Sequence, residues 1–142
     1  MNMNCDPTVD YLMVDDIVEY IGDEMKDSRY YERLAARAPT VRSRELLMEF
    51  SREEWTHAQN LIGAYHRLTG RNFVPAPVEE PVIPAEYEEA LKQRILAETA
   101  DYKKYGIKYQ MACDPGLKSM FYGLRTIEAQ HAMRMPILME EA

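Results

Sequence analysis

The chain has 142 residues, of which 24 are acidic and 17 basic, and its formal net charge is -7 at pH 7. Proteins that bind the phosphate backbone of nucleic acids usually concentrate basic charge, so this acidic balance argues against nucleic acid as a partner. The length corresponds to one ordinary domain, which can bury a large core without disulfides.

The N-terminal segment and the two cysteines indicate in which cellular compartment the protein is expected to lie. Residues 1–14 lack the basic start and apolar run of a secretory signal, and no stretch approaches the roughly 20 apolar residues of a membrane span. We therefore expect a cytoplasmic protein that does not bind membranes. Cys5 and Cys113 lie far apart without a Cys-x-x-Cys pair. We expect both to be free thiols rather than part of a disulfide framework or a thiolate metal site.

Apolar residues recur at three- and four-residue spacing in four segments, which predicts four amphipathic helices. Pro39 ends the first helix, and Gly70 closes the second as a natural helix terminator. Pro136 is expected to kink the fourth helix or end it early, because proline lacks the backbone N–H that helix interiors use. The predicted helices cover about residues 7–38, 40–69, 85–112 and 116–140.

The connector between the second and third helices, residues 71–84, contains four prolines and no helical period, which predicts extended chain. At about 3.1 Å per residue it reaches roughly 43 Å, close to the length of a helix of about 28 residues. It can therefore return along a whole helix, so that the second and third helices run parallel. Short turns within each hairpin and one long crossover between them predict a single-domain, all-α, ferritin-like four-helix bundle.

A repeat with an offset of 74 residues relates the two predicted hairpins. Apolar positions follow it, for example Ile21 and Ile95. In both hairpins 30 residues separate the two repeated glutamates, which suits a pseudo-twofold bundle that brings four carboxylates to one level. The polar pairs that the offset superposes are Glu24 with Glu98, Asp27 with Asp101, Tyr31 with Tyr105, Glu54 with Glu128 and His57 with His131.

The repeated glutamates and histidines lie on the apolar stripes of their helices. Four buried carboxylates would repel one another or take up protons, whereas two divalent cations would neutralise them. Two imidazoles complete a shell of oxygen and nitrogen suited to iron or manganese. Each Glu-x-x-His motif also places two ligands one turn apart on one helix face. The sequence therefore predicts a dimetal site formed by Glu24, Glu54, His57, Glu98, Glu128 and His131.

On these motifs the chain resembles the rubrerythrin branch of the ferritin-like superfamily over nearly its whole length. The resemblance implies two metal ions as cofactor, with iron expected and manganese as the alternative; zinc can occupy such a site in purified protein. It also implies a role for each ligand. Glu24 and Glu98 would be terminal ligands, Glu54 and Glu128 would bridge the two ions, and His57 and His131 would bind opposite ions.

Four further residues of the repeat are candidates for the surroundings of the metals. Rubrerythrins carry an additional glutamate one turn after the ligand of the third helix; here Asp101 stands in that position, so its ligation is left open. Asp101 and Asp27 could ligate, accept the imidazole N–H groups or be solvated. Tyr31 and Tyr105 lie two turns from the glutamates of their helices, where they could donate a hydrogen bond near the metals or simply pack.

The resemblance further implies a function, the reduction of hydrogen peroxide or dioxygen at the dimetal centre. Many rubrerythrins also carry a rubredoxin-like domain, in which four cysteines hold an iron ion. This sequence has only Cys5 and Cys113, which are too few for such a site. Electrons would then come from an external donor such as a rubredoxin-like protein. Two alternatives stay open at this stage. One is iron storage or ferroxidase-type metal handling, and the other is a structural bundle that binds metal incidentally.

Several polar and aromatic residues are predicted to face outward. We expect Glu53 and His66 to be exposed to solvent. Trp55 and Tyr30 are also predicted to point away from the bundle. Outward aromatic residues can be covered by a second copy, and symmetric dimers are the commonest assemblies, so we expect a homodimer.

Overall fold

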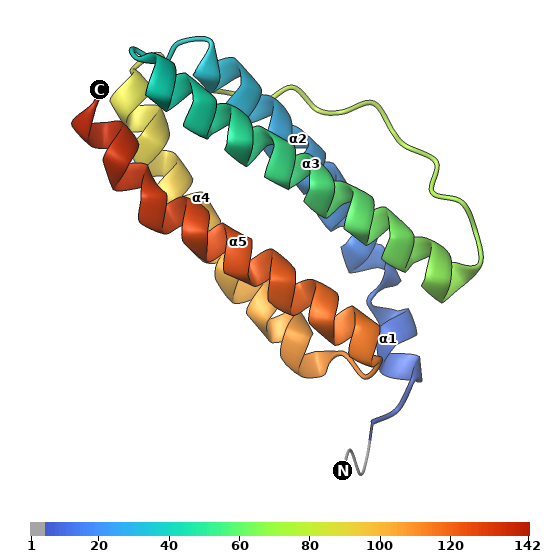
Figure 1. The fold of residues 1–142 in the computed structure, drawn as a ribbon. Coiled ribbons are helices and arrows are strands. Elements are labelled where there is room, and N and C mark those ends of the chain that lie inside the picture. The colour runs from blue at the N-terminus through green and yellow to red at the C-terminus, as the bar shows by residue number, and fades with distance from the viewer. Residues whose placement is uncertain (1–4) are drawn as a thin grey trace.

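The structure, a computed structural model, describes residues 5–142 (Figure 1). The prediction of an all-α fold is confirmed, because every regular element within these residues is a helix. The elements are α1 (Thr8–Leu12), α2 (Val14–Ala35), α3 (Val41–Thr69), α4 (Tyr87–Met111) and α5 (Pro115–Glu140).

The four long helices form two antiparallel hairpins, α2 with α3 and α4 with α5, and the closest packing lies within each hairpin. The chain between α3 and α4 runs without regular structure along the outside of the first hairpin (Figure 1). It carries the chain back to the end of the bundle where α3 began, so α3 and α4 run parallel, as the crossover length predicted. Glu80 pairs with Arg29 at 2.7 Å and with Arg33, which ties this crossover to α2.

The ends of the helices follow from local chemistry. The Thr40 side chain accepts the backbone N–H of Ser43 at 3.0 Å and caps α3. Gly70 ends the same helix with a φ of 69°, a left-handed conformation that glycine adopts without steric cost. Asp114 caps α5 by accepting the N–H of Leu117 at 2.8 Å.

The continuity of the first predicted helix is wrong, and of the two outcomes expected at Pro136 one is excluded. The first predicted helix is interrupted at Met13, because the Met13 N–H bonds the carbonyl of Asp10, three residues back, at 3.1 Å. The fourth helix was expected to kink or to end early at Pro136; it does not end there but continues to Glu140, the bound predicted for it. Met135 and Leu138, on either side of the proline, are fully buried, and their packing holds the last turns in place despite the missing hydrogen bond.

The prediction of free thiols is also wrong, since Cys5 and Cys113 form a disulfide. Asp10 explains how they meet. Its buried carboxylate accepts the N–H groups of Cys113 at 2.7 Å and Asp114 at 2.8 Å, which brings the N-terminal segment against the turn between α4 and α5. A separation of 108 residues along the chain therefore becomes a contact in space.

The hydrophobic core consists of two clusters. One lies toward α1 and contains Ile17, Leu61 and Phe121. The other lies toward the α2–α3 turn and contains Leu34, Leu47 and Leu138. Between the two clusters the helices present buried polar side chains to one another. No helix in the described part of the chain is both long enough and apolar enough to cross a membrane.

Candidate metal centre

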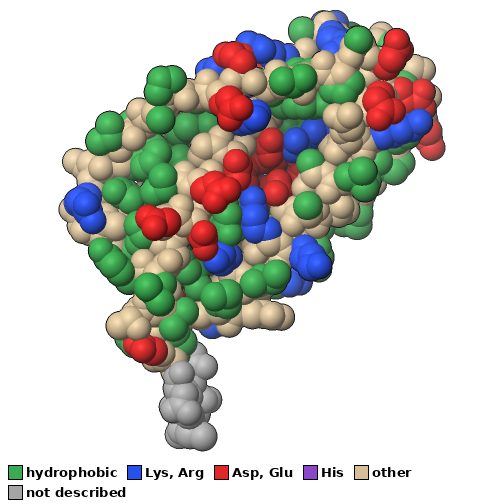
Figure 2. Space-filling view, turned by 180° about the vertical axis from the view of Figure 1, so that it is seen from behind, with side chains coloured by type: hydrophobic (Ala, Val, Ile, Leu, Met, Phe, Trp, Pro, Cys, Tyr) green, Lys and Arg blue, Asp and Glu red, His purple; other side chains and the backbone are tan. Residues whose placement is uncertain are grey.

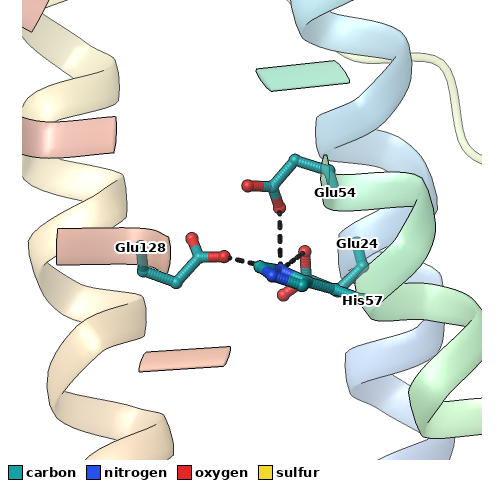
Figure 3. Close-up of side chains that lie close together, drawn as sticks. All are labelled: Glu24, Glu54, His57 and Glu128. Carbon is teal, nitrogen blue, oxygen red and sulfur yellow. Dashed lines mark ion pairs between the residues drawn. The ribbon is translucent and has the colours of Figure 1, made fainter. Parts of the chain in front are cut away.

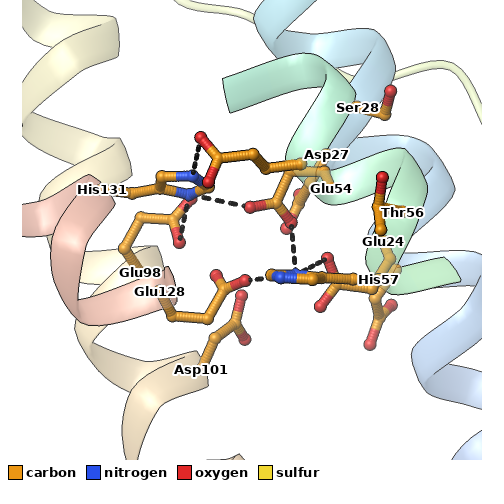
Figure 4. A network of polar contacts seen from close by, with 12 residues as sticks. Glu24, Asp27, Ser28, Glu54, Thr56, His57, Glu98, Asp101, Glu128 and His131 are labelled. Carbon is orange, nitrogen blue, oxygen red and sulfur yellow. Dashed lines mark ion pairs between the residues drawn. The ribbon is translucent and has the colours of Figure 1, made fainter. Parts of the chain in front are cut away.

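The six predicted ligands come together in the middle of the bundle, each turned inward from one of the four long helices (Figures 3 and 4). All are buried, and His57, the most exposed of the six, is only 4% exposed. Their ligand atoms form two groups, in each of which the atoms lie within 4.8 Å of one another. Glu54 and Glu128 belong to both groups. The groups are Glu24, Glu54, His57 and Glu128, and Glu54, Glu98, Glu128 and His131.

The two groups have nearly the same geometry. Nδ1 of His57 lies 2.9 Å from Oε1 of Glu128, and Nδ1 of His131 lies 2.9 Å from Oε1 of Glu54. The carboxylates of Glu24 and Glu98 lie slightly farther from the imidazoles, with Nδ1 of His57 3.5 Å from Glu24 and Nδ1 of His131 3.6 Å from Glu98 (Figure 4). The 74-residue repeat therefore corresponds to a pseudo-twofold axis that passes through the site and relates the two hairpins.

Among residues 5–142 the inward-facing atoms of this cluster have no hydrogen-bond partners, although buried polar atoms are normally hydrogen-bonded. Short contacts such as that of His57 with Glu128 do not have the geometry of a hydrogen bond. One cation in each group would satisfy these lone pairs, and the mixed oxygen and nitrogen donors suit iron or manganese. The unpartnered atoms are Glu24 Oε2, both oxygens of Glu54 and of Glu128, Glu98 Oε2, and Nδ1 of His57 and of His131.

The charges of the cluster conflict when no cation is present. Burial, followed by repulsion from neighbouring carboxylates, raises the pKa of Glu54 and Glu128 well above the ordinary value. Burial acts in the same direction on Glu24 and Glu98. Contacts with Glu54 and His57 nevertheless leave the pKa of Glu24 below its ordinary value, and contacts with Glu128, His131 and Arg94 do the same for Glu98. Without a cation, burial and mutual repulsion therefore favour the protonated forms of Glu54 and Glu128.

Tyr31 and Tyr105 reach the site and cross between the hairpins. The Tyr31 hydroxyl on α2 donates to Oε1 of Glu98 on α4, and the Tyr105 hydroxyl on α4 donates to Oε1 of Glu24 on α2. Each terminal carboxylate therefore has its outer oxygen held by a tyrosine, while its other oxygen faces the ligand cluster. These hydroxyls position the carboxylates, which goes beyond a role in packing.

Asp27 and Asp101 lie beside the cluster, outside the two ligand groups, and each is paired with a cation of α4. Arg94 donates to Asp27 at 3.1 Å, and Lys104 lies 3.1 Å from Asp101. Burial raises the pKa of Asp27 to about 7 and that of Asp101 to about 6. Asp27, Arg94 and Asp101 line one hollow between α2 and α4, and Figure 2 shows acidic and basic side chains gathered on this face.

Arg94, which was not among the residues predicted from the sequence, is 6% exposed and contacts the site directly. Its Nη2 donates to Oε1 of Glu98 at 2.8 Å and its Nε to the Tyr31 hydroxyl at 3.1 Å. The signal was present, because Arg94 lies four residues before Glu98 on the same helix face. Tyr30, predicted to point outward, is instead buried, with the Arg94 guanidinium 5.0 Å from the centre of its ring.

Glu53 is a second residue that differs from its prediction. It is 26% exposed, and its Oε1 lies 3.5 Å from Nε2 of His131, on the side of the ring away from the ligands. Glu53 and His57 also line a groove of about 580 Å³ between α3 and α5. This groove connects the surface with the His57 end of the site. His66 and Trp55 are exposed, as predicted.

A comparison with protein-family models agrees with this geometry. The model described as Rubrerythrin matches residues 18–139, from the first turns of α2 to the last turn of α5. All six residues of the cluster lie within the matched range. Neither the curated proteins nor the solved structures gave a match.

Proposed function

The chain belongs to the rubrerythrin family, and from this premise we propose that its buried cluster holds two iron ions and reduces hydrogen peroxide or dioxygen. One observation carries the proposal above all. Two nearly identical groups of inward-facing, unpartnered ligand atoms share Glu54 and Glu128, which is the arrangement that two bridged cations require. A bundle that only needed buried polar residues for helix register would have satisfied these atoms with hydrogen bonds.

Each group of residues has a role in the proposed reaction. Glu54 and Glu128 would bridge the ions, Glu24 and Glu98 would hold one ion each, and the tyrosine hydroxyls would fix these terminal carboxylates. The bound iron pair would supply two electrons. Together with two protons, these break the O–O bond of hydrogen peroxide to give two water molecules. The groove between α3 and α5 would admit so small a molecule to the His57 side.

An external protein of the rubredoxin type is the proposed source of the electrons that restore the ferrous state. We also propose that the protein works as a homodimer, because large side chains on the outer faces of α3 and α5 remain open to solvent. Trp55 on α3 is 48% exposed, and Tyr122 on α5 is 51% exposed. Sedimentation of the wild type and of the Trp55→Glu variant tests this, and a monomeric wild type would contradict it.

The proposed reaction is tested by loading the protein anaerobically with ferrous ion and mixing it rapidly with hydrogen peroxide. We expect two metal ions per chain, oxidation of two ferrous ions per peroxide, and then a stall until a reductant is added. The Glu54→Ala, Glu128→Ala double variant should lose both ions. Normal metal content in that variant would rule out the assignment of the site.

The same experiment separates peroxide reduction from iron storage. Oxidation no faster than that of free ferrous ion would argue against a reductase. A purified assembly of many subunits filled with ferric mineral would favour storage or a ferroxidase role instead.

A further inference from the structure

The two halves of the site differ at Arg94, where the internal repeat breaks down. The 74-residue offset pairs Arg94 with Tyr20, which carries no charge. Glu98 consequently has a buried guanidinium 2.8 Å from its Oε1. The corresponding oxygen of Glu24 accepts a hydrogen bond only from the Tyr105 hydroxyl among the described residues. The cation nearest that half, Lys104, lies over the Tyr105 ring and pairs with Asp101.

This difference limits how Glu98 can bind a metal. A carboxylate oxygen has two lone pairs, and on Oε1 of Glu98 both are used, one by Tyr31 and one by Arg94. Glu98 can therefore offer only Oε2 to a cation. Oε1 of Glu24 keeps a free lone pair, so Glu24 can bind through both oxygens. The guanidinium also withdraws negative charge from Glu98, and because Arg94 is buried, water screens this effect little.

Resting on the proposed function, we propose that Arg94 makes the two metal positions unequal. The Glu24–His57 position binds a divalent ion more tightly and fills first, and the Glu98–His131 position binds more weakly and fills second. Arg94 is thus a positioning residue that acts through Glu98.

Two carboxylates, Asp27 beside Arg94 and Glu53 beside His131, oppose this effect, and both act more weakly than Arg94. Asp27 shares the guanidinium, with Oδ1 3.1 Å from Nη1 and Oδ2 3.1 Å from Nη2, but the hydrogen bond from Nη2 to Glu98 is shorter, at 2.8 Å. Glu53 lies behind His131 and strengthens that imidazole as a ligand. Its oxygen is 3.5 Å away and its side chain is partly solvated, whereas Arg94 contacts Glu98 at 2.8 Å inside the core. The contact of Arg94 with Glu98 therefore determines which of the two metal positions binds more weakly.

Anomalous scattering from crystals given one equivalent of manganous ion tests the proposal on the wild-type protein. We expect most of the metal at the Glu24–His57 position. Equal occupancy, or more metal at the Glu98–His131 position, would overturn the proposal while leaving the two-metal site itself intact. Binding of fewer than two ions at saturation would instead be a failure of the proposed function.

Titration with manganous ion tests the part played by Arg94. In the Arg94→Met, Asp27→Asn variant the net charge of the protein is unchanged. We expect the ratio of its two stepwise dissociation constants to fall on the order of 10- to 100-fold from the wild-type ratio. Arg94→Lys, which keeps the charge but not the fork of donors, should give an intermediate ratio.

A matched control removes another ion pair between the same two helices. Lys108 on α4 pairs with Asp16 on α2 at 2.5 Å and contacts none of the six ligands. The Lys108→Met, Asp16→Asn variant should keep the wild-type ratio of dissociation constants. A change in the control as large as that in the Arg94 variant would show that the effect is not specific to Arg94.

Discussion

Glu54 and Glu128 carry the strongest charge conflict in the core. Both are fully buried, and burial followed by the neighbouring carboxylates raises their pKa values well above the ordinary value. These two residues belong to both ligand groups, so an ion bound in either group would compete with protons for their oxygens. Binding of a metal ion would therefore be coupled to proton release at Glu54 and Glu128.

The stability of the metal-free protein should fall as pH rises from about 4 to 7. A carboxyl whose pKa is raised by folding stabilises the fold below its unfolded pKa, and this stabilisation is lost as pH rises through the folded value. Asp101, with a pKa of about 6, and Asp27, with a pKa of about 7, titrate within this window. Glu24 and Glu98 have lowered pKa values and lose stabilisation only at more acidic pH.

Thermal melting of chelator-treated protein at several pH values measures this dependence. Saturating manganous ion should raise the melting temperature most at the alkaline end, because binding to the native state stabilises it by mass action. A melting temperature of the metal-free protein that rises steadily with pH would contradict the charge assignment.

Replacing the two bridging carboxyls by neutral isosteres should separate stability from function. At pH 8 the metal-free Glu54→Gln, Glu128→Gln variant should be more stable than the wild type, because a buried amide stays neutral without taking up a proton. It should also lose most of its metal binding. Denaturant unfolding and elemental analysis measure the two effects. Glu45→Gln, an exposed change on the same helix, should alter neither.

The candidate ligands could be predicted from the sequence because each has an equivalent in the other half of the repeat. They also lie on apolar stripes, where a buried charge requires a partner of opposite charge. The same logic could not find Arg94 or Glu53. Their repeat partners are Tyr20 and Ile127, so neither residue has a charged counterpart in the other half. The repeat therefore could not predict that Arg94 and Glu53 lie at the site, and their contacts were found only in the structure.

At the scale of helices, the hydrophobic period and the proline-rich crossover were sufficient to predict the four long elements and their directions. The details that differed depend on contacts between elements. Packing of Met135 and Leu138 carries α5 past Pro136, and a carboxylate of α1 reaches a turn more than 100 residues away. Such tertiary contacts override local propensity and leave no periodic signal.

The link between α1 and the α4–α5 turn should depend on Asp10. Its buried carboxylate accepts two backbone N–H groups, and Asp10→Asn replaces one acceptor oxygen by a donor that faces one of them. We expect a loss of about 2 kcal/mol in the free energy of unfolding. Denaturant unfolding measures it, with the exposed change Asp15→Asn as the matched control. Equal effects of the two substitutions would show that the Asp10 contacts do not stabilise the fold.

At the scale of the whole molecule, the site occupies a polar layer between two apolar clusters and between two hairpins. The hairpins pack more closely within themselves than against each other, and the groove between α3 and α5 is where this looser contact reaches the ligands. Several glycines line the groove, including Gly63 and Gly123. Small residues therefore keep open a path that ends at His57.

Filling this groove should slow access to the site without changing what the site binds. A Cβ atom at Gly123 would meet nothing within 4 Å, so Gly123→Leu can place its side chain in the groove without displacing the helix. Gly22→Leu is the matched control, because Gly22 also lies in a helix with nothing within 4 Å and does not line the groove. Both changes should raise helix propensity by up to about 1 kcal/mol. Stopped-flow mixing with manganous ion should give slower uptake for Gly123→Leu alone, while both variants bind two ions at equilibrium. Unchanged uptake in Gly123→Leu would mean that ions enter by another face, of which the hollow between α2 and α4 in Figure 2 is the next to block.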